Sequence, residues 1–219
     1  MKKVRGIIFD LDGVLVFTDK FHYQAWKVLA DGLGIPFDEK INNRLRGVSR
    51  MDSLEIILEQ YHGEALTREK KEELAEQKNH LYRELLKTMT PDDVTPQVRH
   101  TLAALRERGI RLSIGSSSKN ARFILDRVDL LDAFDAISDG NNITRSKPDP
   151  EVFLKGAEFL GLEPGECAVV EDARAGIDAA KAGNMLAIGI GDACVYEKTD
   201  YSLHALSDLL EIVDKMNVE

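Results

Sequence analysis

The spacing of apolar residues divides the chain into two kinds of sequence. From about residue 15 to residue 90 the apolar positions recur with the spacing of amphipathic helices, and no convincing strand interrupts them. The apolar face of the first predicted helix, over residues 20–34, comprises Phe21, Ala25, Val28 and Leu29. Two further helices are predicted over residues 49–63 and 68–89. This part of the chain is therefore expected to be helical throughout.

Polar residues stand where the predicted helices should begin. Ser49 and Asp52 have the spacing of a capping box, and Thr67 is a suitable N-cap for the long helix that follows it. Thr95 and Pro96 have the residue types of an N-cap and a first helical position, so another helix is predicted from residue 96.

From residue 91 onward, short apolar runs alternate with helical stretches. Strands are predicted over residues 111–115, 135–139, 167–172 and 185–190, and helices over residues 96–108, 118–128, 149–161 and 173–183. In the helix over 149–161, Asp149 should be the cap, Pro150 the first position, and Gly161 the residue past the end. Such alternation indicates a parallel sheet that is covered by helices on both faces.

The apolar run Val4–Phe9 belongs with this sheet, because a core without it would begin only at residue 96. The sequence therefore predicts an α/β fold with a doubly wound, mainly parallel, Rossmann-like sheet. Residues 1–14 and 91–219 should form this core, and residues 15–90 should form a helical cap domain inserted after the first strand.

Composition narrows the possible functions. The chain has 219 residues, of which 43% are hydrophobic and 31% charged, as in ordinary globular proteins. A formal net charge of −9 argues against a nucleic-acid or anionic-membrane surface, although a local basic pocket could still bind an anionic substrate. Cys167 and Cys194 lack metal-ligand spacing, and no secretory leader or membrane-length apolar stretch is apparent. We expect a monomeric cytoplasmic protein with reduced thiols.

Two carboxylates directly follow the first predicted strand. Asp10 and Asp12 are two residues apart, so in an extended segment their side chains would lie on one face. Like charges at that spacing are unfavourable unless a cation joins them or one carboxyl stays protonated. By itself the pair is weak evidence for a site, because aspartate at a strand end is common as a cap or turn residue.

The ends of the other predicted strands also carry polar side chains. Ser116, Ser117 and Ser118 precede a helix, Lys147 precedes another, and Glu171 and Asp172 follow a strand. Each group has a plain structural alternative, as a capping turn or a solvated lysine. Their joint placement at the carboxyl ends of parallel strands favours a site instead. Converging carboxylates are typical of Mg²⁺ binding, and a lysine beside a serine-rich helix start is typical of phosphate binding, so phosphoryl transfer is predicted.

These motifs resemble those of the haloacid dehalogenase superfamily of phosphotransferases. The resemblance extends from "FDLDGV" through "GSSSKN" and "SKPDP" to "VVEDARAGIDAAKAG". In the helical segment, "TDKFHYQAWKVLA", "LRGVSRMDSLEIIL" and "QKNHLY" are similar to the corresponding parts of the β-phosphoglucomutase family. Related sugar-phosphate phosphatases share some of these cap motifs.

The resemblance implies different roles for Asp10 and Asp12. Asp10 would be the nucleophile that forms an aspartyl phosphate, and Asp12 the general acid and base. The metal, Mg²⁺, would be held by Asp10, the backbone carbonyl of Asp12, Asp172 and Glu171, the last directly or through water. Ser116 and Lys147 would hold the transferring phosphoryl group.

The resemblance also implies a second anion site in the cap. Gly47, Val48, Ser49 and Arg50 would bind a remote phosphate, although without the resemblance we would favour a charged helix start. The further residues implied in phosphate binding, sugar binding or cap closure are Thr18, His22, Trp26, Arg46, Ser53, Lys78, Ser117, Ser118, Lys119 and Asn120. Of these, His22 could equally be a packed surface residue and Trp26 part of the cap core.

Together these residues imply a phosphomutase that interconverts β-D-glucose 1-phosphate and glucose 6-phosphate, with glucose 1,6-bisphosphate as primer or intermediate. The alternative is a sugar-phosphate phosphatase, in which water attacks the same aspartyl phosphate. A non-catalytic binding module is a third reading, which the intact acids and lysine disfavour. The chain departs from the mutase pattern at Arg46, where lysine is expected, and at Val16 and Phe17, where polar residues are common.

Overall fold

A computed structural model describes residues 3–46 and 48–217 of the chain. Within these residues lies a six-stranded sheet of order β3-β2-β1-β4-β5-β6, in which every neighbouring pair is parallel. The strands are β1 (Gly6–Phe9), β2 (Arg111–Gly115), β3 (Ala136–Ser138), β4 (Cys167–Glu171), β5 (Leu186–Ile190) and β6 (Tyr201–Leu203). This order is that of a doubly wound sheet, so the predicted fold class is confirmed.

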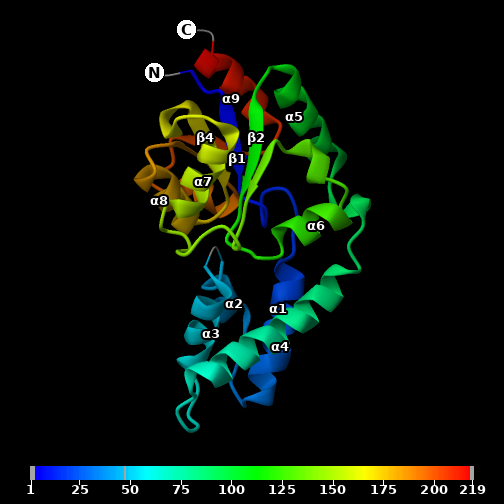
Figure 1. Ribbon diagram of the computed structural model, residues 1–219, viewed down its shortest axis with the longest axis vertical. Helices are drawn as coiled ribbons and strands as arrows, with labels where there is room; N and C mark the ends of the chain where they lie inside the picture. Colours follow the sequence, from blue (N-terminus) through cyan, green and yellow to red (C-terminus); the bar gives the residue numbers. More distant parts are fainter. Residues whose placement is uncertain (1–2, 47, 218–219) are drawn as a thin grey trace.

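Helices cover both faces of the sheet (Figure 1). Alternate residues of β1 point to opposite faces, so Ile7 and Phe9 join one buried cluster and Ile8 joins another. The first cluster packs against α5 (Pro96–Glu107), α6 (Ala121–Arg127) and α9 (Asp208–Asn217). The second packs against α7 (Glu151–Leu160) and α8 (Arg174–Ala182). Burial on both sides explains the nearly continuous apolar sequence of the central strands.

The residues between β1 and α5 form a helical segment with a core of its own. It comprises α1 (Asp19–Gly32), α2 (Glu39–Asn43), α3 (Arg50–Leu58) and α4 (Arg68–Leu86). Trp26, Leu54 and Ile57 are buried in a third apolar cluster, which includes no residue of the sheet. In Figure 1 this segment lies beyond the carboxyl ends of the strands, which is the edge where ligands bind in doubly wound sheets.

The predicted helix starts are largely confirmed. The hydroxyls of Ser49, Thr67 and Thr95 each accept a hydrogen bond from the backbone N–H three residues later. Helix α7 begins one residue later than expected, at Glu151, although an Asp149 carboxylate oxygen still accepts from its N–H at 3.0 Å. Short 3₁₀ turns cover η1 (Pro91–Asp93), η2 (Leu131–Ala133), η3 (Pro164–Glu166) and η4 (Gly191–Val195).

Several predictions about individual elements were wrong or incomplete. The first strand begins at Gly6, two residues after the predicted start. Val28 does not lie on the buried face of α1, since it is 61% exposed while the neighbouring Trp26 is buried. The sequence analysis missed α2, β6 and α9, because the first two are too short to show a periodicity and the third follows an irregular connection.

Among the described residues, no helix is both long enough and apolar enough to cross a membrane. The structure does not test the expected cytoplasmic location, which stays a prediction.

The contrast between Leu54 and Val28 predicts how the helical segment responds to loss of side chains. Leu54→Ala removes a fully buried side chain and should lower the free energy of unfolding by about 2–5 kcal/mol. Val28→Ala, at an exposed position in the same segment, should change it by about 0.5 kcal/mol or less. Urea denaturation of both variants measures the difference, and equal effects would contradict the packing described here.

Candidate active site

The register of the sheet brings the predicted polar groups together. Asp10 directly follows β1, and its N–H donates to Val170 O of β4 at 2.9 Å. Because β4 is the parallel neighbour of β1, the strand-end residue Glu171 lies beside Asp10. Ser116 follows β2, the other neighbour of β1, and is buried. These groups therefore meet at the middle of the carboxyl edge of the sheet.

Lys147 reaches this point from the loop between β3 and α7. Its Nζ lies 2.5 Å from Asp10 Oδ1 and 2.7 Å from Glu171 Oε2, and its side chain is 1% exposed. Burial alone would lower the pKa of Lys147, but the charges of Asp10 and Glu171 and the hydrogen bonds to them outweigh burial and raise it. Lys147 is therefore a permanent positive charge behind the nucleophile candidate.

Three carboxylates form a group that could hold a metal ion. Oxygens of Asp10, Glu171 and Asp172 lie within 4.8 Å of one another. Burial raises the pKa of Asp10 well above its ordinary value and that of Asp172 to about 8, and Glu171 adds to both shifts. Glu171 is already well satisfied, because Oε2 accepts from Lys147 and Oε1 from the N–H groups of Asp172 and Ala173.

This donor set fits Mg²⁺. All three side chains offer hard oxygen ligands, and their charges outnumber the one lysine that contacts the group. A divalent cation would remove the repulsion that raises the pKa values of Asp10 and Asp172. Asp10, Asp172 and Glu171 could all contribute to such a site, and Glu171 already accepts hydrogen bonds from Lys147 and two backbone N–H groups.

Two glycines make room for the carboxylates. Gly13 has φ +90°, and a Cβ there would overlap the carboxylate of Asp172. Gly176, in the first turn of α8, lies so close to Glu171 that a Cβ would overlap its carboxylate. Gly176 was missed by the sequence analysis, although a glycine inside a helix often indicates such a close approach.

Asp12 has a different environment from Asp10. Thr18 Oγ1 donates a hydrogen bond to Asp12 Oδ1, and Tyr82 OH donates to Thr18 Oγ1 at 3.0 Å. Burial raises the pKa of Asp12 to about 6, while the hydrogen bond from Thr18 opposes that shift. A carboxyl with this pKa can exist in both protonation states near neutral pH, as a general acid and base must.

A buried pair of basic side chains lies next to this chain of hydrogen bonds. Lys78 Nζ is 2.9 Å from His22 Nδ1 and lies over the rings of Trp26 and Tyr82, 4.6 Å and 4.4 Å from their centroids. His22 stacks on Tyr82 with ring centroids 4.0 Å apart. Burial and the positive charges around them lower the pKa values of both His22 and Lys78.

A cavity of about 1060 Å³ separates the strand ends from the helical segment. The predicted site residues that line it are Asp10, Asp12, His22, Trp26, Arg46, Val48, Ser49, Arg50, Ser53, Lys78, Ser116, Ser117, Ser118, Lys119, Asn120, Glu171 and Asp172. Thr18 and Lys147 are buried behind the wall and reach the site through their contacts. Gly47 lies outside the described residues. Trp26 serves both readings proposed for it, since it lines the cavity and belongs to the apolar cluster of the helical segment.

Two arginines of the helical segment enter this cavity. Arg46 Nη2 donates to Asp19 Oδ2 at 2.7 Å, and Nη1 lies 3.7 Å from Asp192 and 4.0 Å from Asp172. Arg50 pairs with Glu76 of α4 and has only 20% of its side chain exposed. Arg46 therefore links the helical segment to Asp172, one of the three carboxylates that could hold a metal ion.

The serine-rich loop forms the other wall of the cavity. Ser116 Oγ accepts from the N–H of Ser118, and Ser118 Oγ accepts from the N–H of Asn120, each at 3.1 Å. The amide of Asn120 bonds to α4, since Oδ1 accepts from Arg83 at 3.0 Å and Nδ2 donates to Asn79 Oδ1 at 2.9 Å. These contacts join the core to helix α4 of the helical segment.

Proteins of similar sequence include enzymes that act on sugar phosphates, as the carboxylates and lysine of the site suggest. The sequence model of the haloacid dehalogenase-like hydrolases matches residues 4–184. The chain belongs to this family. It is 41% identical to the β-phosphoglucomutase of Bacillus subtilis over 94% of the chain and 92% of that protein. It is 30% identical to a phosphorylated carbohydrates phosphatase of Thermotoga maritima over 83% of the chain and 82% of that protein.

A solved structure of the same family supports this assignment. The structure of β-phosphoglucomutase from Clostridium difficile covers 98% of this chain and is itself covered to 97%, with a TM-score of 0.91 and 36% identity. Family relatives of this chain therefore include both mutases and phosphatases that act on sugar phosphates.

Some residues of the site were not predicted from the sequence. Tyr82 was not singled out, although it stacks on His22 and bonds to Thr18. Asp19, Asn79 and Arg83 were missed as partners of predicted site residues. A charged or amide residue on a helix gives no sign in the sequence of which distant side chain it meets.

The hydrogen bond from Thr18 generates a prediction for Asp12. Thr18→Val keeps the shape of the side chain but removes the donor that favours the ionised carboxylate, so the pKa of Asp12 should rise above about 6. Carboxyl ¹³C NMR titration of the metal-free protein measures this change. An unaltered or lowered pKa would contradict the role assigned to Thr18.

Proposed function

We propose that this protein is a Mg²⁺-dependent phosphomutase that interconverts β-D-glucose 1-phosphate and glucose 6-phosphate. One observation carries the proposal: a single cavity is lined both by the carboxylate group around Asp10 and by Arg50 and Ser49 of the helical segment. A mutase of this kind needs a second anion site for the phosphate that is not reacting. The 41% identity to a β-phosphoglucomutase over most of both chains supports the same substrate class.

In the proposed reaction, Asp10 attacks the phosphorus of the substrate and forms an aspartyl phosphate as the bond to the sugar oxygen breaks. Asp12 gives its proton to that oxygen and later takes one from the hydroxyl that receives the phosphoryl group. Lys147 and Ser116 hold the phosphoryl oxygens and offset their charge. Asp10 and Asp172 would hold the Mg²⁺, which would supply positive charge to the phosphoryl oxygens.

The remote phosphate should bind at the start of α3. Arg50 offers a planar guanidinium and is the first residue of α3, where backbone N–H groups lack partners within the helix. Lys119 and Asn120, on the facing wall of the cavity, would contact the same phosphate or the sugar. Binding on both walls would let glucose 1,6-bisphosphate present either phosphate to Asp10 in turn.

We further propose that residues 15–90 act as a cap domain on a core of residues 1–14 and 91–219. The Asn120 contacts to α4 already join the two parts, and closure over a bound substrate would exclude water from the aspartyl phosphate. We infer that the enzyme works as a monomer in the cytoplasm, with no nucleic-acid or membrane partner, as its net charge of −9 favours.

The phosphatase alternative uses the same Asp10 chemistry with water as acceptor, and the relative from Thermotoga maritima favours it. The deciding experiment supplies β-glucose 1-phosphate, Mg²⁺ and a trace of glucose 1,6-bisphosphate, and measures glucose 6-phosphate against free phosphate. Our proposal expects glucose 6-phosphate to dominate, with no product from Asp10→Asn. Predominant release of free phosphate would favour the phosphatase.

A prediction for Arg50 separates the cap site from the core. Arg50→Ala should lower kcat/KM for isomerisation by about 10²-fold or more, because a bidentate contact to the remote phosphate is lost. Phosphorylation of Asp10 by acetyl phosphate, which has no remote phosphate, should keep a nearly normal rate. Kinetic assays of both reactions measure the split.

The matched control for this prediction is Arg44→Ala, which removes an exposed arginine of the same segment that pairs with Glu59. Arg44→Ala should leave both rates within about threefold. Equal losses in the two assays of Arg50→Ala would point to general damage, and no loss in either would leave Arg50 a plain helix-start residue.

A further inference from the structure

Lys147 is carried by a loop that has no regular secondary structure between the end of β3 and the start of α7. Its ammonium must nevertheless lie between Asp10 and Glu171, where it is almost fully buried. A long lysine side chain on a loose loop would lose considerable conformational freedom to stay there. The structure must therefore fix the loop backbone close to Lys147.

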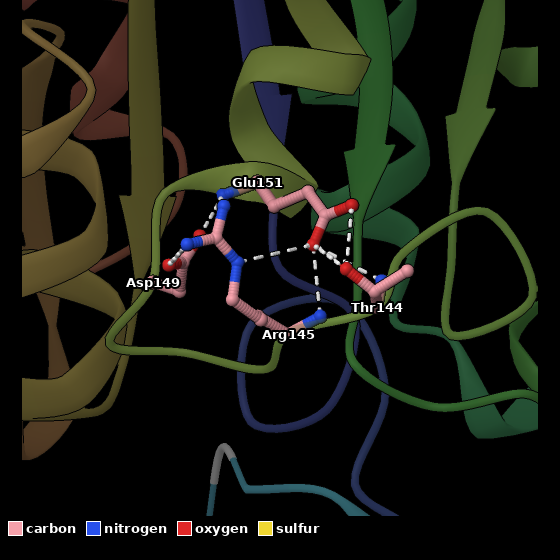
Figure 2. Close-up of polar contacts among 4 residues, drawn as sticks. All are labelled: Thr144, Arg145, Asp149 and Glu151. Atoms are coloured by element: carbon pink, nitrogen blue, oxygen red, sulfur yellow. Dashed lines mark hydrogen bonds and ion pairs between the residues drawn. The ribbon is translucent and has the colours of Figure 1, made fainter.

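Glu151 provides such a fixed point (Figure 2). Its Oε2 accepts from the backbone N–H groups of Thr144, at 3.0 Å, and Arg145, at 2.8 Å. The hydroxyl of Thr144 lies 3.0 Å and 3.3 Å from the two carboxylate oxygens and donates to them. One side chain of α7 thus holds two successive peptide units that precede Lys147 by two and three residues.

Glu151 is itself held in place by the start of α7. As the first residue of the helix, it donates its N–H to Asp149 Oδ1 at 3.0 Å. The N–H of Asp149 donates to Ser146 O at 3.0 Å, which closes the turn around Lys147. Both ends of the segment 146–148 are therefore attached to the same helix start, with Lys147 in its middle.

The backbone hydrogen bonds matter more here than the ion pair beside them. Arg145 Nη1 is 3.0 Å from Asp149 and Nε is 3.9 Å from Glu151, but the Arg145 side chain is 71% exposed. Exposed ion pairs of this kind contribute little. Glu151 is 18% exposed, and the backbone N–H of Arg145 lowers its pKa, which keeps it an ionised acceptor at neutral pH.

We propose that Glu151 is a positioning residue, which holds residues 144–147 in the conformation that delivers Lys147 to Asp10 and Glu171. The inference rests on the proposed function only in giving Lys147 a role at the transferring phosphoryl group. A misplacement of about 1 Å in a catalytic group can lower a rate about 10²-fold. Release of this loop should therefore slow the phosphorylation of Asp10.

The test compares Glu151→Ala with Glu151→Gln in the full-length protein. The glutamine keeps one oxygen that accepts from the Thr144 and Arg145 N–H groups, and its NH₂ can donate to the Thr144 hydroxyl. Two measurements are made on each variant: amide hydrogen exchange at residues 144–147, and the rate at which acetyl phosphate with Mg²⁺ phosphorylates Asp10.

Glu151→Ala should speed exchange at residues 144–147 by about tenfold or more and slow phosphorylation by about 10–10²-fold. Glu151→Gln should recover most of both effects. Arg145→Ala removes the exposed ion pairs with Asp149 and Glu151 but also a side chain that lines the cavity, so it serves as the control for hydrogen exchange, which should stay within about threefold of wild type. Glu158→Ala, which removes an exposed glutamate of the same helix that pairs with Lys155, should leave both measurements within about threefold.

Three results would overturn the proposal. Unchanged exchange at residues 144–147 in Glu151→Ala would show that the carboxylate does not hold the loop. Faster exchange with a normal phosphorylation rate would show that the loop does not position Lys147. Equal impairment of the alanine and glutamine variants would make the charge of Glu151, rather than its hydrogen bonds, the important property. Failure of the wild-type protein to form an aspartyl phosphate would instead overturn the proposed function, and the exchange measurement would still test Glu151.

Discussion

The contact of one buried lysine with two buried carboxylates determines most of the arrangement of this site. Lys147 Nζ lies within hydrogen-bond distance of Asp10 and Glu171, and breaking such a contact would leave an uncompensated buried charge. The parallel register of β1 and β4 sets the two carboxylates side by side, and Gly176 leaves room for Glu171. With Asp172 added, negative charge still exceeds positive charge in the group, which favours a divalent cation.

The helical segment is connected to the site by hydrogen bonds that lead to Asp12. The hydrogen-bond chain from Tyr82 through Thr18 to Asp12 connects α4 to the loop after β1. Asp12, with a pKa of about 6, therefore lies near Asp10, which belongs to the group of carboxylates that could hold a metal ion. The two aspartates, two residues apart, therefore have separate partners. This separation resolves the repulsion that their spacing implies, since Asp10 faces Lys147 and Asp12 faces Thr18.

Local features of this protein could be read from its sequence, whereas contacts between distant side chains could not. Periodicity, caps and strand ends were enough for the doubly wound sheet and for the group of Asp10, Lys147 and Asp172, because parallel strands bring their carboxyl ends to one edge. On helix α1 the predicted Phe21, Ala25 and Leu29 are buried, but the buried face extends toward Trp26 and Ala30, which leaves Val28 exposed. The hydrogen bonds from the loop to Glu151 could not be predicted from the sequence, because they depend on where the loop folds back on α7.

The most direct test of this account is calorimetric titration of the metal-free protein with Mg²⁺ at pH 7, in buffers of different ionisation enthalpy. Burial and neighbouring charge raise the pKa of Asp172 to about 8, so this carboxyl carries a bound proton at pH 7 before the metal arrives. The account predicts that Mg²⁺ binding releases protons and that Asp172→Asn weakens binding and reduces the release. Binding without proton release, or binding unaffected by Asp172→Asn, would contradict it.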